Sequence, residues 1–357
     1  IREGDNVSDT KFNILLSFII PAHNSERTLS NCVESIENDV HLSDISCELI
    51  IIENGSEDNT LNIAKTLQKK FANVLLEVSE KGVSKARNRG LEVATGRKIV
   101  FVDYDDVWVN GSIEAIAKQL AAADADLFMY GYYKENKEVI HDYGRMEEIF
   151  SENIDDFKAW LLVRPTLRMQ VWAKVFDDGV IKDKTLRFNE ELSYSEDSEF
   201  LLRYVQSCNT VGIFSKPIYR YLCSGVSAVR TYNPQRMQGY IKSLEVTAIE
   251  VANEAAPVRE AYLEYILAHF NLIAVHDIFD MQIQGSFIKK LRKMKQLKNE
   301  PLFRSALDKI SLNRCLTVQL SPEAFIKCHL NLMAGLVCYM KAFLNYRKQR
   351  KVSIAET

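Results

Sequence analysis

Apolar and polar residues follow two different periods along the first 130 residues. Nearly continuous apolar runs, which are typical of buried strands, occupy residues 14–20, 47–52, 74–78, 98–102 and 127–132. Helical periodicity fills the intervals at residues 26–38, 60–71, 83–94 and 112–122. This alternation predicts an α/β fold, in which a mostly parallel sheet is covered by helices on both faces and binds ligands beyond the carboxyl ends of its strands.

The pattern changes further along the chain. Residues 155–162 and 198–206 read as helices, and 211–214 as a short strand. After Asn233 and Pro234, strand patterns stop and helical periodicity covers residues 237–253, 258–279, 285–297 and 322–348. We therefore predict an α/β domain over residues 1–232 and an all-helical domain over residues 233–357.

Composition and charge narrow the class of protein. The 357 residues are 47% hydrophobic and 26% charged, which excludes a disordered chain. Seven scattered cysteines without a CxxC pair argue against a disulfide framework and fit the reducing cytoplasm. Residues 289–351 hold 15 Lys and Arg against three acids, a charge of +12 in a chain whose net charge is −3. Such a split predicts an anionic partner for the basic segment.

Three carboxylates follow the fourth predicted strand, at Asp103, Asp105 and Asp106. Clustered carboxylates repel one another unless a cation neutralises them, and oxygen ligands suit Mg²⁺ or Mn²⁺, which also coordinate diphosphates. The alternative is a polar loop whose Asp residues cap the helix that begins at Ser112. Both interpretations fit the residues alone.

Four further polar segments fall near strand or helix ends, and each has a structural explanation as well as a functional one. Turns and helix caps would account for the first two and for the last, and a solvated basic helix face for the third. Arg nevertheless suits phosphate oxygens, and Arg87 lies where a diphosphate would bind. The segments are Pro21 to Glu26, Glu53 to Asp58, Gly82 to Gly90, and Glu196 with Asp197.

Together the segments resemble glycosyltransferase family 2, the inverting enzymes with the GT-A nucleotide-diphospho-sugar fold, over roughly residues 14–226. The family reads Pro-x-Tyr-Asn, Asp-Asp-Gly-Ser-x-Asp, Gly-x-x-x-Ala-Arg-Asn-x-Gly, Asp-x-Asp-Asp and Glu-Asp, and the last three motifs match here in order and spacing. Trp172 and Lys174 resemble the family's Trp-x-Lys, and residues 219–227 its closing segment. Two positions depart from the pattern: His23 replaces Tyr, and Glu53-Asn54 replaces Asp-Asp.

The resemblance implies a role for each matching residue on the donor side. Pro21, His23 and Glu26 would border the nucleoside, with Glu26 on the ribose. Asn54 and Arg87 would face the base and the diphosphate. The remaining donor-side roles are those of the carboxylates: Asp103 near the ribose, Asp105 on an Mn²⁺ or Mg²⁺ ion, and Asp106 in support of that ion. Uracil is the expected base, although Asn54 keeps only the acceptor oxygen of the usual Asp and loses its charge.

On the acceptor side, the resemblance makes Asp197 the general base for the attacking hydroxyl. Glu196, Trp172 and Lys174 are candidates for the acceptor site; the alternative for the last two is a core Trp with a surface Lys. The expected activity is inverting transfer from a UDP-sugar to a glycan or lipid-linked glycan, as in the synthesis of bacterial surface polysaccharides.

Two other classes of protein are alternatives to a glycosyltransferase. A nucleotidyltransferase shares the sheet architecture but would carry a basic, Gly-rich loop after the first strand, where this chain has His23 to Glu26. A non-catalytic glycan-binding relative would have lost its acids, which are present here. The missing GxGxxG disfavours a dinucleotide-dependent dehydrogenase.

The basic segment at residues 285–351 predicts peripheral contact with the inner face of the cytoplasmic membrane. Phe325, Leu332, Leu336, Tyr339 and Phe343 recur at helical spacing and would form one apolar face of an interfacial helix. The alternative is that this face packs on the catalytic domain or in a homo-oligomer. A nucleic-acid partner is not expected.

Overall fold

The structure, a computed structural model, describes residues 14–134, 137–141, 149–150, 153–222, 233 and 235–355, with the backbone alone at 149–150 and 348–355. Contacts divide the chain into two compact units. The first holds residues 1–152, 171–190 and 207–223, and the second holds 153–170, 191–206 and 224–357. The boundary predicted at residue 232 lies close to the last division, but two earlier helical segments group with the later helices.

The first unit is built on one sheet, with strand order β3-β2-β1-β4-β9-β6-β10-β5. Its first four strands are parallel, and short β9 runs antiparallel to both β4 and β6. β6 and β10 are parallel, so the predicted, mostly parallel sheet is confirmed. The strands on this path are β1 (Leu16–Ala22), β2 (Cys47–Glu53), β3 (Val74–Val78), β4 (Lys98–Phe101), β5 (Val107–Trp108), β6 (Leu127–Lys134), β9 (Lys174–Asp177) and β10 (Val211–Tyr221).

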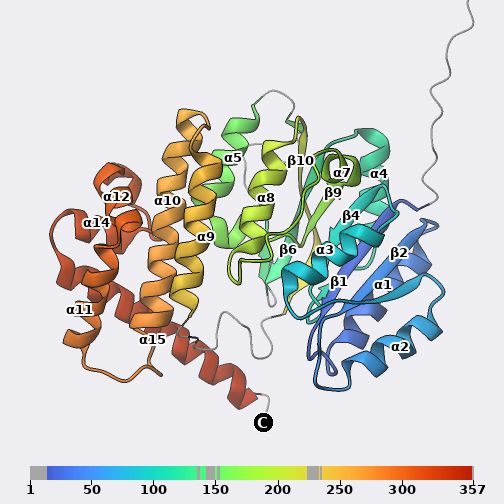
Figure 1. Cartoon of the computed structure of the whole chain (residues 1–357), viewed down its shortest axis with the longest axis horizontal. Helices are drawn as coiled ribbons and strands as arrows, with labels where there is room; N and C mark the ends of the chain where they lie inside the picture. The colour runs from blue at the N-terminus through green and yellow to red at the C-terminus, as the bar shows by residue number, and fades with distance from the viewer. Residues whose placement is uncertain are drawn as a thin grey trace, which may run out of the picture. The chain divides into compact units, whose positions relative to one another are not determined.

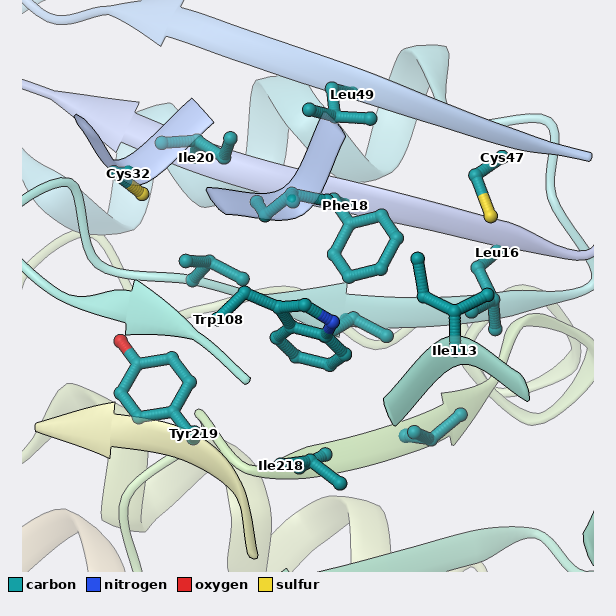
Figure 2. Close-up of a cluster of buried hydrophobic side chains, with 14 of the residues drawn as sticks. Leu16, Phe18, Ile20, Cys32, Cys47, Leu49, Trp108, Ile113, Ile218 and Tyr219 are labelled. Atoms are coloured by element: carbon teal, nitrogen blue, oxygen red, sulfur yellow. The ribbon is translucent and has the colours of Figure 1, made fainter. Parts of the chain in front are cut away.

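Two short strands lie off this path: β7 (Lys137–Val139) pairs with β6, and β8 (Ile149–Phe150) pairs with β10. Alternate side chains of β1 point to opposite faces. Leu16, Phe18 and Ile20 join a hydrophobic core with Trp108 and the apolar sides of three helices (Figure 2). These helices are α1 (Leu29–Leu42), α2 (Thr60–Lys70) and α4 (Ser112–Ala122).

The opposite face of β1 carries Ile19, which packs against helix α3 (Val83–Val93). A Cβ atom added to Gly90 of α3 would lie only 2.4 Å from Ile19 Cγ2, so the helix can approach the strand this closely because residue 90 is glycine. The remaining helix of this unit, α7 (Asp178–Asp183), follows β9. Helices therefore cover both faces, as the sequence predicted.

The second unit is helical throughout its described residues (Figure 1). Helices α9 and α10, which follow each other in the chain, pack side by side, and α10 also packs on α5. Its elements are α5 (Ile154–Val163), α6 (Pro165–Arg168), α8 (Glu196–Gln206), α9 (Arg236–Val251), α10 (Ala256–Ile273), the π-helical turn η1 (Ala274–Ile278), α11 (Phe287–Lys298), α12 (Pro301–Lys309), α13 (Leu312–Cys315), α14 (Ser321–Lys327) and α15 (Asn331–Ala355).

One detail of the helical prediction is wrong. The helix predicted over 322–348 is broken into α14 and α15 at His329, whose φ of 61° cannot continue a right-handed helix. Cys328 is exposed at the same break, although the other described cysteines are buried. In the part of the chain that the structure describes, no helix combines the length and apolarity that crossing a membrane requires.

Candidate active site

The loops that follow β1 and β2 interlock at the carboxyl edge of the sheet. Parallel register places Ala22 opposite Glu53, so the two loops begin side by side. The His23 imidazole donates from Nδ1 to the Asn54 carbonyl over 2.9 Å, since a carbonyl can only accept. The backbone N–H of Asn24 donates to Ser56 Oγ over 3.1 Å. The predicted nucleoside-binding segments are therefore one hydrogen-bonded structure.

The predicted ribose ligand Glu26 belongs to the same network. Its backbone N–H donates to Asp58 Oδ2 over 3.1 Å, and its Oε2 accepts from the N–H of Asn59 over 3.2 Å. Glu26 is exposed and His23 is half-buried, whereas Pro21 is buried within β1. Of the three, Glu26 and His23 therefore offer surface to a ligand in this structure.

Asn54, one of the residues that depart from the family pattern, is buried, and both polar atoms of its side chain form hydrogen bonds. Its Nδ2 donates to Ser79 Oγ (2.8 Å) and to the carbonyls of Glu80 (2.5 Å) and Gly82 (3.2 Å). Its Oδ1 accepts the N–H of Gly82 over 2.9 Å. An Asp could also accept the N–H of Gly82, but it could not donate to the two carbonyls. The loop before α3 therefore requires an amide at this position. This network explains the departure, and the predicted contact of Asn54 with the base stays a prediction.

Arg87 lies on the buried side of α3, one turn before Gly90. Its guanidinium is 5.2 Å from the Phe188 ring centroid, and its NH2 atom lies 3.4 Å from Asp103 Oδ1. Only 5% of the Arg87 side chain is exposed, against 33% of Asp103. The close approach of α3 to β1 thus holds one positive charge beside the carboxylates that follow β4.

The Asp103–Asp106 loop is fastened to β10 by a buried carboxylate. Asp106 Oδ2 accepts the Tyr219 hydroxyl over 2.7 Å, and Asp106 Oδ1 accepts the N–H of Leu222 over 2.7 Å. Tyr219 Oη also accepts the N–H of Asp103 over 3.0 Å. Burial, with the charge of Asp103 second, raises the pKa of Asp106 to about 8. Asp106 therefore braces the loop, and its predicted support of a metal ion stays a prediction.

The alternative explanation of this loop, that its Asp residues cap the Ser112 helix, is wrong. The N-terminus of α4 is capped from α1 by Asp39, whose Oδ2 accepts the N–H groups of Ser112 (3.1 Å) and Ile113 (2.9 Å). The same oxygen accepts the Trp108 indole N–H over 2.9 Å. The carboxylates after β4 are thus not needed for capping. Asp39 could not be identified as the cap from the sequence, because it lies 73 residues before Ser112 and no local pattern links the two residues.

Whether the loop suits a cation can be judged from its carboxylates. Asp103 and Asp105 are both partly exposed, whereas the two oxygens of Asp106 already accept hydrogen bonds. Within the described ranges, no three or more His, Cys, Asp or Glu side chains are grouped so that they could hold a metal. A cation here would take its other ligands from the substrate, and Mg²⁺ and Mn²⁺ commonly bind through one or two carboxylates and phosphate oxygens. The residues present fit such an ion.

Trp172 and Lys174, the candidate acceptor residues of the first unit, differ from each other in burial. The half-buried Trp172 ring stacks on Tyr219 (4.8 Å between centroids, 8° between planes) and on Tyr221 (5.4 Å, 13°). Lys174, the first residue of β9, has no exposed surface. The surface Lys of the structural alternative is therefore wrong. Trp172 supports Tyr219, the residue that holds the Asp103–Asp106 loop.

Glu196 and Asp197 belong to the second unit, where they begin helix α8. Both are half-buried, and Asp197 Oδ1 accepts the N–H of Ser198 over 2.9 Å. The next acid, Glu199, is buried and is held by Arg203 through two hydrogen bonds of 2.6 and 2.8 Å. Both acids lie in the first turn of α8, so the helix N-terminus expected as their structural explanation is present.

The residue before this helix is held by a buried histidine. Ser195 adopts a φ of 57°, and its hydroxyl donates to His269 Nε2 over 3.1 Å. The same ring donates from Nδ1 to the Tyr265 carbonyl over 2.9 Å. Burial lowers the pKa of His269 to about 4, so the ring is neutral and its Nε2 can accept. This pair fixes the turn that presents Glu196 and Asp197.

Comparison with known proteins gives one family. Residues 17–181 match the sequence profile described as Glycosyl transferase family 2. The putative glycosyltransferase EpsH of Bacillus subtilis (strain 168) is 24% identical over 308 residues, which cover 82% of this chain and 86% of EpsH. Poly(ribitol-phosphate) beta-N-acetylglucosaminyltransferase TarS of Staphylococcus aureus (strain Mu50 / ATCC 700699) is 23% identical over 256 residues, covering 71% of this chain but 43% of TarS.

A solved structure agrees with these sequence matches. The crystal structure of S. aureus TarS 1-349 in complex with UDP-GlcNAc superposes with a TM-score of 0.64 at 18% identity, over 94% of this chain and 92% of that chain. At this identity the likeness concerns the fold. It confirms the predicted GT-A fold with a helical C-terminal region.

The Asn54 network predicts that restoring the family's usual residue is harmful here. Asn54→Asp places a carboxylate against the carbonyls of Glu80 and Gly82, and we expect it to lower the free energy of unfolding by roughly 1–3 kcal/mol at pH 7. Urea denaturation measures the change. Asn62→Asp, the same substitution at an exposed position of α2, is the control and should be nearly neutral. Equal stability of Asn54→Asp and the wild type would contradict the network.

The buried His269 predicts a pH-dependent term in stability. Its pKa is about 4 in the folded chain against 6.5 for the free side chain, so the unfolded chain binds the extra proton first. The contribution is therefore complete above pH 6.5 and is lost as the pH falls towards 4, by at most about 1.4 kcal/mol per pH unit. The stability difference between wild type and His269→Gln should shrink over this window. His41→Gln, which removes an exposed histidine, is the matched control.

Proposed function

This chain belongs to glycosyltransferase family 2, and we propose that it transfers a sugar from a UDP-sugar to a hydroxyl of a glycan or lipid-linked glycan in the synthesis of a bacterial surface polymer. As a glycosyltransferase it falls in EC 2.4. The donor is proposed by analogy with TarS, whose crystal structure contains UDP-GlcNAc and whose name states N-acetylglucosamine transfer to poly(ribitol-phosphate). EpsH, matched over most of its length, supports the assignment to glycosyl transfer.

One observation carries the proposal: the charge arrangement at the end of β4. A nearly buried Arg87 lies beside the partly exposed Asp103, and Asp105 follows in the same loop. A guanidinium that is held by α3 and cannot retreat into solvent suits the oxygens of a diphosphate. The interlocked loops after β1 and β2 would hold the nucleoside, with His23 and Glu26 as the accessible contacts.

Asp105 would hold the divalent cation, with the diphosphate supplying further ligands. Mn²⁺ or Mg²⁺, when bound, supplies positive charge that stabilises the leaving diphosphate. Asp103 would contact the ribose, and Asp106, whose oxygens are occupied by Tyr219 and Leu222, would keep the loop in place. Arg87 would share the neutralisation of the diphosphate. In this proposal the protein contributes a fixed binding geometry that need not reorganise during the reaction.

The acceptor hydroxyl would be activated by Asp197. As the acceptor oxygen forms its bond to the anomeric carbon, the bond from that carbon to the diphosphate oxygen breaks, and Asp197 takes the hydroxyl proton. UDP leaves with the electron pair of the broken bond. Because attack and departure occur on opposite faces, the single displacement inverts the anomeric configuration. The Ser195–His269 pair would keep the carboxylate at its position on α8.

A substitution at Asp105 tests the donor site. With Mn²⁺ and a panel of nucleotide sugars, release of UDP should identify the donor, and Asp105→Ala should lower that release at least about a hundredfold while the melting temperature stays near that of the wild type. Asp44→Ala, at an exposed acid outside the site, is the control. Full activity in excess chelator would contradict the cation. Formation of a nucleotide sugar from a sugar phosphate and UTP would indicate a nucleotidyltransferase instead.

A second substitution tests the base. Asp197→Asn keeps the shape of the side chain, but an amide cannot accept the proton, so turnover should fall roughly 10²–10⁴-fold. Binding of UDP, measured by calorimetry, should persist because Asp197 is assigned to the acceptor. Glu196→Gln, the neighbouring change on the same helix, should affect turnover less. Near wild-type turnover of Asp197→Asn would assign the base to another residue.

A further inference from the structure

Helix α15 has its small residues inside and its large apolar residues outside. Ala334, Gly335, Cys338 and Ala342 are buried, and a Cβ atom on Gly335 would lie 2.7 Å from Leu291 Cδ1 of α11. The other side of the helix, here called the outer face of α15, consists of residues that are all large, apolar or aromatic, and between 37% and 61% exposed: Leu332, Met333, Leu336, Tyr339, Met340, Phe343 and Leu344. A surface helix of a globular protein normally shows the reverse pattern.

No charged side chain interrupts this face before Arg347. The only charged residue between Asn331 and Tyr346 is Lys341, and its ammonium group turns to the carbonyls of Val318 and Gln319. A pocket of about 520 Å³ adjoins the outer face and shares Leu336 and Tyr339 with it. Contiguous apolar surface of this kind marks an interaction site.

The charges around the outer face indicate what covers it. Helix α15 contains no acidic residue in its 25 positions, and its sequence continues from Arg347 to Lys348, Arg350 and Lys351. Helix α11, which packs on α15, exposes Lys289, Arg292 and Lys293. Among the residues with described side chains, none of these three forms an ion pair with an acid. Excess positive charge beside an apolar face matches an anionic, apolar-cored surface.

We propose that the outer face of α15 docks on an anionic lipid bilayer, with its Leu, Met and Phe side chains at the acyl boundary and the neighbouring Lys and Arg at the lipid phosphates. A second copy of the chain is the other candidate occupant, but stacking two such surfaces would bring like charges together. The prediction from sequence placed Phe325 on the same face; the break at His329 puts it on α14 instead. The proposal does not depend on the catalytic assignment.

Vesicle flotation tests this surface with the full chain. Wild type should float with vesicles of equimolar phosphatidylcholine and phosphatidylglycerol, less at high salt, and weakly with phosphatidylcholine alone. The combined variant Leu332→Gln, Met340→Gln and Phe343→Gln should reduce the floated fraction at least about tenfold. Because all three side chains are exposed, folding should be retained, as judged by the melting temperature.

A matched variant controls for the loss of apolar surface in general. Leu42→Gln, Leu75→Gln and Ile249→Gln remove three exposed apolar side chains elsewhere and should leave flotation unchanged. Separately, Lys289→Glu with Lys293→Glu should abolish the preference for anionic vesicles. Equal flotation of the α15 variant and the wild type would overturn the proposal. So would a wild-type dimer in light scattering that the α15 variant converts to monomer, if neither protein binds vesicles.

Discussion

The hydrogen bond from the Tyr219 hydroxyl to Asp106 organises the candidate donor site more than any other single contact. Tyr219 lies on β10 and Asp106 in the loop after β4, so the bond joins two strands that are not neighbours in the sheet. Trp172 stacks on the back of the tyrosine ring, and Leu222 occupies the second carboxylate oxygen. Burying this carboxylate is unfavourable, as its raised pKa records, and the two donors offset that penalty only in one loop geometry. The positions of Asp103 and Asp105 follow from it.

The strands and helices of the first half were predictable because the apolar residues of each recur with the spacing of a buried strand or of an amphipathic helix. The strand predicted at 98–102 and the helix predicted at 83–94 differ from β4 and α3 by one residue. Strand β9 was not predictable, since four residues that begin with a fully buried Lys174 carry no recognisable pattern. Its place between β4 and β6 depends on partners far along the chain, such as the buried Lys98, whose Nζ lies 2.7 Å from Asp177.

Part of the candidate site was likewise predictable from the sequence and part was not. Residue types and spacing were sufficient to select the acids after β4, Arg87 and the pair at the start of α8. They could not identify the residues that hold these in place, because Tyr219 and His269 act from distant segments. Asn54 shows the limit most clearly: as a departure from a motif it suggested a weakened base contact, whereas its amide is required by the carbonyls of the loop before α3.

The antiparallel insertion of β9 also has a consequence for how the chain is made. During synthesis β1, β2, β3 and β4 emerge first and can pair with one another, because all four lie within residues 16–101. The free side of β4 then waits for a strand that appears more than 70 residues later, after β6 has already left the ribosome. Until then the nascent chain presents an open strand edge, which is where another polypeptide could pair. The lysine at the start of β4 places a charge beside that edge, which discourages edge pairing, and in the folded chain Asp124 and Asp177 both pair with it.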